Sequence, residues 1–318
     1  MLLGVDIGAT RTKLGLLNPS TVELKEQTVV DTPQGATTEE FLAWVQETLQ
    51  NFLRGTTLVE ALGVGIAGFV TYEGIVEHSP NMPALQQLPF RAWLSALFPF
   101  PIVVDNDANV AAWAEYRVGA ARDVTDCLYI TLGTGVGGAL IVGGKLWRGV
   151  HGGAGDVGHM VVDITASGQV GMPPYRIGVL EEYVGKAALL RCAQSLVRRY
   201  PASVLTSRPV TVESLAEAYA AGDEAARECL AWVAWVCALG VTSVVTLLDV
   251  EVVVLGGGIV EAFPELPSAV QATVRERALP ALAEKIQLRR AHFGSWAGVI
   301  GAALLARDSQ IVRDSTNA

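Results

Sequence analysis

The sequence has little charge, little cysteine and no basic cluster, and each shortage excludes a class of protein. Only 17% of its 318 residues are charged while 51% are apolar, so large cores can form and extensive disorder is excluded. Four cysteines without a C-x-x-C pair are too few for a secreted disulfide scaffold, and they fit a reducing cytosol. The net charge is −9 and no Lys/Arg cluster forms a basic face, so we expect no nucleic-acid partner.

One segment has no charge at all. Residues 229–248 form an uncharged run of twenty residues, which is long enough to span a bilayer. Gly240 and Thr242 interrupt its second half, and after Asp249 the chain enters a strand-like run at 251–255. No basic cluster flanks the run, and the N-terminus lacks the basic region of a signal peptide. We therefore expect a buried helix in a cytoplasmic protein with no membrane partner.

The spacing of apolar residues predicts an α/β protein with a duplicated plan. The first third of the chain reads as strand–strand–strand–helix–strand–helix–strand–helix, with strands at 2–7 and 13–17 around a Gly-Ala-Thr turn. The plan restarts at 126–149, where two apolar strands again flank a Gly/Thr turn. Later helices are expected at 180–199, 211–220, 223–248 and 298–307, with a strand at 251–255.

The length predicts two domains, at roughly 150 residues per domain. We place an N-terminal α/β domain at residues 1–110 and a larger C-terminal α/β domain at residues 111–297. The C-terminal helix, residues 298–310, could complete the first domain.

The turn DIGATRTK (residues 6–13) joins the first two strands and combines a carboxylate with small and hydroxyl residues. Gly8 allows backbone N–H groups to approach a phosphate, and the hydroxyls of Thr10 and Thr12 can donate to it. Asp6 can hold Mg²⁺, which takes one or two carboxylates together with phosphate oxygens. An ordinary hairpin turn is the alternative, because Gly and Asp are common in turns.

A second glycine-rich turn, LGTGVGGAL (132–140), contains the spacing G-x-G-x-x-G. A dinucleotide site needs a helix that opens within these glycines, whereas the following residues ALIVGG are typical of a strand, so that fold is disfavoured. A P-loop is also excluded, because Leu146 follows Lys145 where Ser or Thr is required. The two interpretations that remain are a glycine hairpin that grips a phosphate with the help of Thr131 and Thr134, and a tight hairpin without a ligand.

Two polar segments can act on a substrate. DNDAN (105–109) follows a buried strand, and a carboxylate at this position can accept a proton from a substrate hydroxyl. Helix capping is the alternative, and we expect one of the first three residues to cap the helix that follows. HGGAGDVGH (151–159) and the later pair Glu181-Glu182 can hydrogen-bond a polyhydroxy ligand. For His159 alone, an ordinary core or loop histidine is the commoner outcome, and no cysteine nearby completes a zinc site.

Taken together, these segments resemble the ROK family of sugar kinases (repressors, open reading frames, kinases). Nine segments match in the family's order: DIGATRTK (6–13), GIAGFV (65–70), SPNMP (79–83), DNDAN (105–109), LGTGVGG (132–138), GGAGDVGH (152–159), LEEYV (180–184), LLDVEVVVLGGGIV (247–260) and GVIGAA (298–303). The resemblance implies a two-domain ribonuclease H-like/actin-like ATPase fold, with duplicated βββαβαβα halves and a cleft between them. It also implies an ATP:hexose phosphotransferase that uses ATP and Mg²⁺.

The resemblance assigns roles to individual residues. Asp107 would be the general base on the sugar hydroxyl, the 6-OH, and Asp6 would lie by the Mg²⁺ that the phosphates hold. The residues implied to bind the sugar are Gly68, Asn81, Asn106, Asp107, Asp156, His159 and Glu181. Those implied to bind ATP are Gly8, Ala9, Thr10, Thr12, Lys13, Thr131, Gly133, Thr134 and Gly135, with Gly256, Gly257 and Gly258 near the adenosine.

The chain departs from the family pattern in three ways. Asp156 stands where the family usually has Glu, and one methylene less can displace a positioning group by about 1 Å. The cysteine positions of the family's zinc loop hold Met172, Pro174 and Val179, so we expect no zinc. The repressor branch carries a DNA-binding domain before the first strand, and with Asp6 so near the start we do not expect one.

Three hypotheses follow from the resemblance and its departures. The first is a hexose kinase with glucose as the substrate, and the second is an N-acetylhexosamine or glucosamine kinase, because of Asp156. The third belongs to another class, a sugar-binding sensor that has lost catalysis. The low share of charge suggests a buried subunit interface, so a homodimer is expected.

Overall fold

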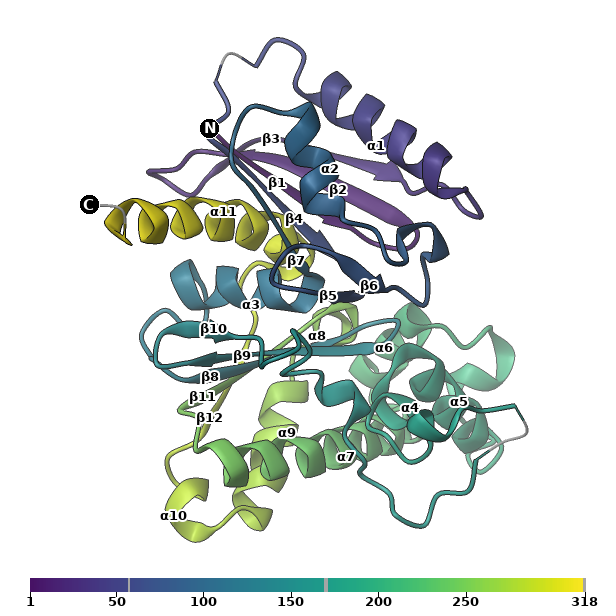
Figure 1. The fold of residues 1–318 in the computed structure, drawn as a ribbon. Helices are drawn as coiled ribbons and strands as arrows, with labels where there is room; N and C mark the ends of the chain where they lie inside the picture. The colour runs from purple at the N-terminus through teal and green to yellow at the C-terminus, as the bar shows by residue number, and fades with distance from the viewer. Residues whose placement is uncertain (57, 169–170, 317–318) are drawn as a thin grey trace. The chain divides into compact units, whose positions relative to one another are not determined.

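The computed structural model describes residues 1–56, 58–168 and 171–316 and divides the chain into two compact units (Figure 1). Unit 1 consists of Met1–Arg122, Leu146–Ala154 and Ser295–Ala318, and unit 2 of Asp123–Lys145 and Gly155–Gly294. The chain therefore changes unit near residue 122. Residue 110, where the sequence suggested a boundary, lies inside a helix of unit 1.

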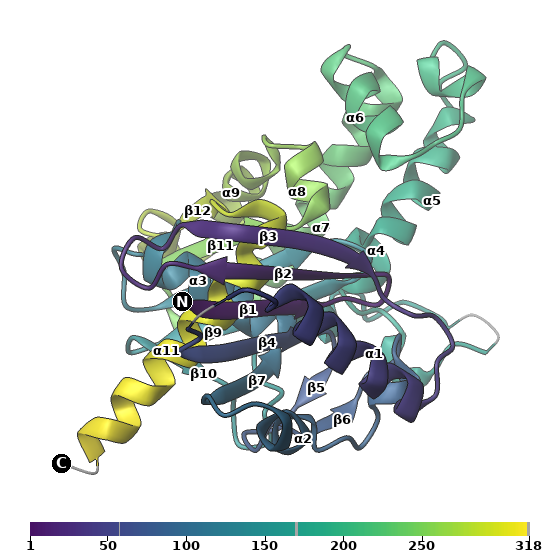
Figure 2. The same cartoon turned by 90° about the horizontal axis from the view of Figure 1, so that it is seen from above.

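Unit 1 contains a five-stranded sheet in the order β3-β2-β1-β4-β7, as Figure 2 shows. Strands β1 (Leu2–Ile7), β2 (Arg11–Leu17) and β3 (Leu24–Asp31) pair antiparallel, whereas β4 (Ala61–Ile66) and β7 (Ile102–Asn106) continue the sheet parallel to β1. A parallel arrangement brings the carboxyl ends of β1, β4 and β7 to one edge of the sheet. A short hairpin of β5 (Phe69–Val70) and β6 (Val76–His78) follows β4.

Helices cover both faces of this sheet (Figure 1). Helices α1 (Thr38–Phe52) and α2 (Phe90–Leu97) lie on one face, and α11 (Ala297–Thr316) lies on the other beside α3 (Asp107–Val118). A 3₁₀ turn, η1 (Pro83–Leu85), precedes α2. Thr37 caps α1 through a capping box with Glu40, in agreement with the expected start of this helix.

The C-terminal helix packs unusually close to the sheet. A Cβ atom on Gly4 would lie 2.0 Å from the carbonyl oxygen of Val299, and one on Gly63 would lie 1.8 Å from that of Ala302. Only glycine fits at these two positions, so α11 lies directly on β1 and β4. The helix expected at 298–307 is present, and it continues to Thr316.

Unit 2 repeats the strand order of unit 1. Its sheet runs β10-β9-β8-β11-β12, formed by β8 (Cys127–Leu132), β9 (Val136–Val142), β10 (Lys145–Trp147), β11 (Val252–Gly256) and β12 (Gln287–Arg290). Strands β8 and β9 are antiparallel, and β8, β11 and β12 are parallel. In both sheets the first strand of the repeat is central, so the duplication predicted from the two Gly/Thr hairpins is confirmed.

The helices of unit 2 include all those that the sequence predicted there. They are α4 (Glu181–Val184), α5 (Lys186–Val197), α6 (Val212–Ala220), α7 (Glu224–Leu248), α8 (Gly258–Ala262), α9 (Leu266–Arg277) and α10 (Pro280–Ala283). The 3₁₀ turns are η2 (Val157–His159), η3 (Pro174–Arg176), η4 (Val204–Ser207) and η5 (Gly294–Trp296), the last of which ends in unit 1. Helices α8, α9 and α10 and strands β10 and β12 were not predicted from the sequence.

Helix α7 contains the uncharged run. Within the described ranges it is the one helix long and apolar enough to cross a membrane, and 56% of its most apolar window is buried inside the protein. Its inner face, with Val233, Cys237 and Val241, belongs to the core of unit 2. Length and composition alone are weak evidence for a membrane span, because a core helix passes the same test.

Candidate active site

In unit 1, acidic residues gather at the carboxyl ends of the parallel strands. Asp6 on β1 is in register with Gly65 on β4, which is in register with Asp105 on β7. Side chains alternate between the two faces of a strand, so Asp6 points to the face of α11 while Val5 and Ile7 point into the core with α1. A Cβ atom on Gly298, in the first turn of α11, would lie 2.7 Å from the carboxylate of Asp6.

The carboxylate of Asp6 is strongly perturbed. Its pKa is raised from 3.8 to about 7, mainly by burial and further by the charge of Asp107, while Lys13 opposes the shift. Asp6 and Asp107 are thus two carboxylates close enough to affect each other's ionisation. Mg²⁺ commonly takes one or two carboxylates together with phosphate oxygens, so this pair fits the ion when a phosphate completes its shell. The described part of the chain holds no cluster of three or more metal-binding side chains, so a protein-only metal cage is not indicated there.

The three polar residues of the DNDAN turn have different tasks. Asn106 caps α3, because its side-chain oxygen accepts from the amides of Ala108 (2.9 Å) and Asn109 (3.1 Å). Its side-chain nitrogen donates to the carbonyl oxygen of Gly68 at 2.9 Å. The prediction that one of the three residues caps the helix is confirmed. Asp107 is the first residue of α3, and its carboxylate accepts from the amide of Ala108 at 2.9 Å.

Hydrogen bonds to two backbone carbonyl groups fix the turn between β1 and β2. Gly8 O accepts from the Thr32 hydroxyl at 2.8 Å, and Ala9 O accepts from the side-chain amide of Gln34. In a trans peptide the following N–H points away from the carbonyl, so the amides of Ala9 and Thr10 are directed away from the 32–34 loop. Thr10 is exposed.

Of the expected ATP-binding side chains of unit 1, that of Thr12 points away from the turn. Thr12 is 2% exposed and its hydroxyl bonds to that of Thr32 at 2.9 Å, so the structure does not bring it to the turn. Thr12 and Lys13 are neighbours on β2 and therefore point to opposite faces of the sheet, and Lys13 lies on the same face as Asp6. The ammonium of Lys13 contacts the carbonyl oxygen of Ser295 and lies 6.0 Å from the ring centre of Trp296.

Asn81 is placed beside the first turn rather than on the sheet edge. It is exposed and lines a pocket of about 250 Å³ together with Ala9, Gln34, Phe41 and Met82. Unit 1 therefore brings Asp6, Gly68, Asn106 and Asp107 to the strand ends, with Asn81 next to the 8–10 turn.

In unit 2, the second glycine turn is a hairpin followed by a strand, as predicted, and not a dinucleotide-binding turn. The amide of Gly133 donates to Gly135 O at 2.9 Å, and Gly133 O accepts from the amide of Lys186 at 2.9 Å. The N–H of Thr134 therefore points away from α5. A Cβ atom on Gly135 would lie 2.3 Å from the carboxylate of Glu181, so a glycine is needed there.

The glycines after β11 border both the hairpin and a pocket. Gly257 has a left-handed φ of 89°, and a Cβ atom on it would lie 2.7 Å from the Thr131 hydroxyl. Gly256 and Gly257 line a pocket of about 580 Å³ whose other walls include Glu261, Arg290 and His292. Gly258 begins α8. The structure thus brings Thr131, Gly256 and Gly257 together.

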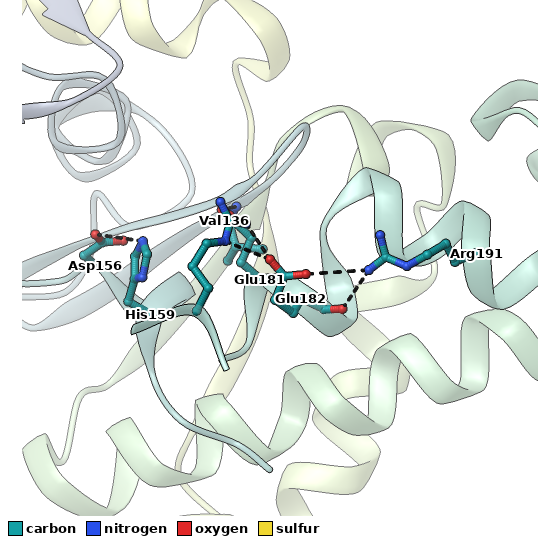
Figure 3. A network of polar contacts seen from close by, with 7 residues as sticks. Val136, Asp156, His159, Glu181, Glu182 and Arg191 are labelled. Atoms are coloured by element: carbon teal, nitrogen blue, oxygen red, sulfur yellow. Dashed lines mark hydrogen bonds and ion pairs between the residues drawn. The ribbon is translucent and has the colours of Figure 1, made fainter. Parts of the chain in front are cut away.

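Figure 3 shows the candidate sugar-binding side chains of unit 2. His159 Nε2 lies 4.0 Å from Asp156 Oδ2, and both side chains are exposed. Partial desolvation of its carboxylate raises the pKa of Asp156, nearby His159 lowers it and the charge of Glu181 raises it, so Asp156 lies within electrostatic range of both side chains. Glu181 accepts from the amide of Val136 at 2.9 Å, which ties it to the glycine hairpin (Figure 3).

A model of the ROK family matches residues 2–309. The chain belongs to the ROK family. It is similar to a glucokinase from Halalkalibacterium halodurans, with 28% identity over 97% of this chain and 95% of the relative. It is also similar to an N-acetylmannosamine kinase from Escherichia fergusonii, with 29% identity over 97% of this chain and 99% of the relative.

The crystal structure of a ROK family glucokinase from Streptomyces griseus in complex with glucose and AMPPNP matches this fold. Its TM-score is 0.81 at 29% identity, and the match covers 96% of this chain and 99% of that one. The predicted actin-like ATPase fold, with mixed α/β sheets in two domains, is confirmed for this ROK protein.

Sequence reasoning missed two arginines of this ROK chain. Arg176 Nη2 lies 2.6 Å from Glu181 Oε1 and 2.6 Å from Glu182 Oε1, so one guanidinium holds both acids. Arg148 forms an ion pair with Asp105, 43 residues away in the sequence. Arg148 lies in a loop and Arg176 in the short 3₁₀ turn η3, so no periodicity marks either of them, and only their type, the usual partner of a buried carboxylate, could have indicated them.

Proposed function

We propose that this ROK protein transfers the γ-phosphoryl group of ATP to a hydroxyl of a hexose, with glucose as the first substrate and the 6-OH as the position. The observation that carries the proposal is the acidic strand-end site of unit 1, where Asp107 begins a helix and lies near enough to Asp6 to raise the pKa of that carboxyl group. The ROK relatives named glucokinases support the class of reaction.

Two glycine turns supply the proposed phosphate contacts. In each turn a neighbouring loop or helix holds a carbonyl group, and this directs the next amide outward: Ala9 and Thr10 in unit 1, Thr134 in unit 2. Backbone amides fixed in this way bind phosphate oxygens without reorganisation. The Thr12 hydroxyl takes no part, because it is buried against Thr32. The pocket beside Gly256 and Gly257 would take the adenosine, as its volume suits a nucleoside.

Asp107 would accept the proton of the attacking sugar hydroxyl. Asp105 is unsuited to this task, because four donors already occupy its carboxylate. The Mg²⁺ that accompanies ATP would neutralise phosphate charge and keep Asp6 ionised. Lys13 adds a positive charge on the same face of the sheet as Asp6.

Glu181, His159 and Asp156 would accept and donate hydrogen bonds to the sugar ring. Glu181 is held on one side by Val136 N and on the other by Arg176, which fixes the direction of its carboxylate. Asp156 is exposed and one methylene shorter than the usual Glu, which leaves room for a substituted hexose. An N-acetylhexosamine or glucosamine is therefore the alternative substrate, and the N-acetylmannosamine kinase relative favours it.

The proposal also covers the cellular compartment and the oligomeric state. A cytosolic protein that forms a homodimer fits the low cysteine content and the exposed Trp232 and Trp235 on α7. A sugar sensor without catalysis is the alternative of another class. It has no need for two carboxylates beside a phosphate-binding turn.

A coupled assay of ATP consumption with a panel of hexoses and N-acetylhexosamines tests the proposal. We expect turnover with glucose or with one N-acetylhexosamine, and the variant Asp156→Glu should shift the preference toward glucose. Asp163→Glu, a change at another acid of unit 2, serves as the control and should leave the preference unchanged. Sugar binding by calorimetry without turnover on any sugar would favour the sensor.

A further inference from the structure

A buried ion pair lies directly before the proposed general base. Arg148 Nε is 2.7 Å and Arg148 Nη2 is 2.6 Å from Asp105 Oδ2, so the guanidinium binds this carboxylate through two N–H groups. The side chain of Asp105 is 4% exposed and that of Arg148 is 19% exposed. Both N–H groups meet one carboxylate oxygen, and charge-assisted hydrogen bonds of this kind are stronger than neutral ones.

The other oxygen of Asp105 organises the turn that carries Asp107. It accepts from the amide of Asn106 at 2.8 Å and from the side-chain amide of Asn109 at 2.7 Å. These two donors flank Asp107 in the chain, one before it and one after it. Asp105 therefore connects Arg148 to the first turn of α3.

Arg148 is itself held in place by unit 1. Its guanidinium lies 5.7 Å from the ring centre of Tyr72, whose hydroxyl donates to Gly149 O at 2.9 Å. The carbonyl oxygen of Arg148 accepts from the amide of Ala154 at 2.9 Å, which closes the segment Leu146–Ala154 into a compact loop. Arg148 is therefore held by contacts in addition to its ion pair with Asp105.

We propose that Arg148 is a positioning residue for phosphoryl transfer, which acts through Asp105 to hold the Asn106–Asn109 turn and thereby the carboxylate of Asp107. The inference rests on the proposed role of Asp107 as the base. A loosened turn moves this carboxylate, and a misplacement of about 1 Å can cost about 100-fold in rate. The proposed contacts to the sugar ring come mainly from Glu181, His159 and Asp156 of unit 2, so the loss appears mainly in kcat.

Steady-state kinetics of Arg148→Lys and Arg148→Met test this role. We expect kcat to fall about tenfold for Lys, which keeps the charge but loses the fork, and about 100-fold for Met, with KM values for both substrates changed by less than about threefold. In an Asp107→Asn background, Arg148→Lys should cause no further loss, because both changes act on one group. An equal loss in both backgrounds would overturn the proposal.

Amide hydrogen exchange gives a second measurement that does not depend on kinase activity. The amides of Asn106, Ala108 and Asn109 should exchange at least about tenfold faster in Arg148→Lys than in the parent. Unchanged exchange in a folded variant would overturn the inference even if the parent shows no kinase activity. If the parent shows no turnover, but the variant loses the protection from exchange that the parent has, only the proposed function is overturned.

Arg117→Met is the matched control. Arg117 lies at the far end of α3 and pairs with Asp308 at 3.3 Å, and it also stacks on Trp113. Its loss removes an ion pair and an aromatic contact from the same helix. We expect a lower melting temperature, because both contacts are lost, and a kcat within about twofold of the parent, because Arg117 lies at the opposite end of α3 from Asp107.

Discussion

The two sheets share one strand order, yet they build their candidate sites from different groups. In unit 1 the polar groups are side chains at the ends of parallel strands, where Asp105 is 3% exposed and burial raises the pKa of Asp6. In unit 2 they are backbone amides of a glycine hairpin and exposed side chains such as Asp156 and His159. Charges in the buried edge of unit 1 act more strongly than charges in water. A duplicated scaffold therefore does not decide the chemistry; the residues at its strand ends do.

Both units nevertheless fix the first hairpin of the repeat in the same way, by hydrogen bonds to its backbone carbonyl groups. Thr32 and Gln34 hold the carbonyls of the turn in unit 1, and the amide of Lys186 holds that of Gly133 in unit 2. If unit 1 carries the chemistry and unit 2 carries recognition, changes in unit 1 should affect turnover and changes in unit 2 should affect substrate affinity.

The largest effect is expected at Asp107. Asp107→Asn removes the proposed base while keeping the size of the side chain and the first turn of α3. Turnover should fall by about 1,000-fold, within the usual range for general base catalysis, while sugar affinity stays within about tenfold. Turnover is followed by ATP consumption and affinity by calorimetry.

Asp31→Asn is the control for this change. Asp31 ends β3 with a side chain that is 95% exposed, so its amide variant should have the turnover of the parent. Turnover of Asp107→Asn within about tenfold of the parent would remove Asp107 as the base.

Asp6 should dominate the pH dependence of the stability of unit 1 in metal-free buffer. Its pKa is raised from 3.8 to about 7, so the folded protein binds this proton more tightly than the unfolded chain does. The stability that the group contributes is complete below pH 3.8 and is lost as the pH rises through about 7. Asp6→Asn should therefore exceed the parent in unfolding free energy at pH 8, by up to about 4 kcal/mol, and match it near pH 4. Urea unfolding from pH 4 to pH 8 in EDTA measures the difference.

Asp163 in unit 2 should show the opposite sign. Hydrogen bonds from the Tyr183 hydroxyl and from Thr165 lower the pKa of Asp163. Its contribution is present above the ordinary pKa and is lost as the pH falls through the lowered value, so Asp163→Asn should weaken the protein at neutral pH. Equal pH profiles for the two Asn variants would contradict the electrostatic contrast between the units.

How far the sequence could predict the site follows from the same contrast. The glycine hairpins, the strand-end acids and the helix cap at Asn106 depend on local patterns, and the sequence indicated each of them. Thr12 was misplaced, because the side of a strand on which a residue lies depends on register: Thr12 pairs with Ile7 of the core and Lys13 with Asp6. Arg148 was missed, because an ion pair between a loop and a distant strand leaves no periodicity in the sequence. Arg176 was missed although its partner Glu181 is close in the sequence, because a 3₁₀ turn before a short helix has no regular spacing either.

In unit 2, the next effect is expected at Glu181. Glu181→Gln keeps the acceptor for Val136 N but removes the charge that Arg176 and the sugar hydroxyls use. The KM for the sugar should rise about 10- to 100-fold with a smaller change in kcat, because a hydrogen bond to a charged group contributes about 1.5–3 kcal/mol. Steady-state kinetics with varied sugar at saturating ATP measure this split.

Glu217→Gln provides the comparison for Glu181, since Glu217 also pairs with an arginine, Arg208, at 2.7 Å, but lies on the exposed side of α6. Its KM should equal that of the parent. A fall in kcat of Glu181→Gln with an unchanged KM would reverse the assignment of recognition to unit 2.

The smallest effect is expected from zinc removal, which should change nothing. The loop at 172–179 has no thiolate, and it is held instead by backbone bonds from Val162 and Asp163 to Gly178 O and by the fork of Arg176. Dialysis against a zinc chelator, followed by Mg²⁺, should leave the sugar KM unchanged, whereas Arg176→Gln should raise it, because Glu181 then loses its charged partner. One zinc ion per chain in metal analysis would show that a metal organises the loop. The orientation of Glu181 would then depend on that ion and not on Arg176.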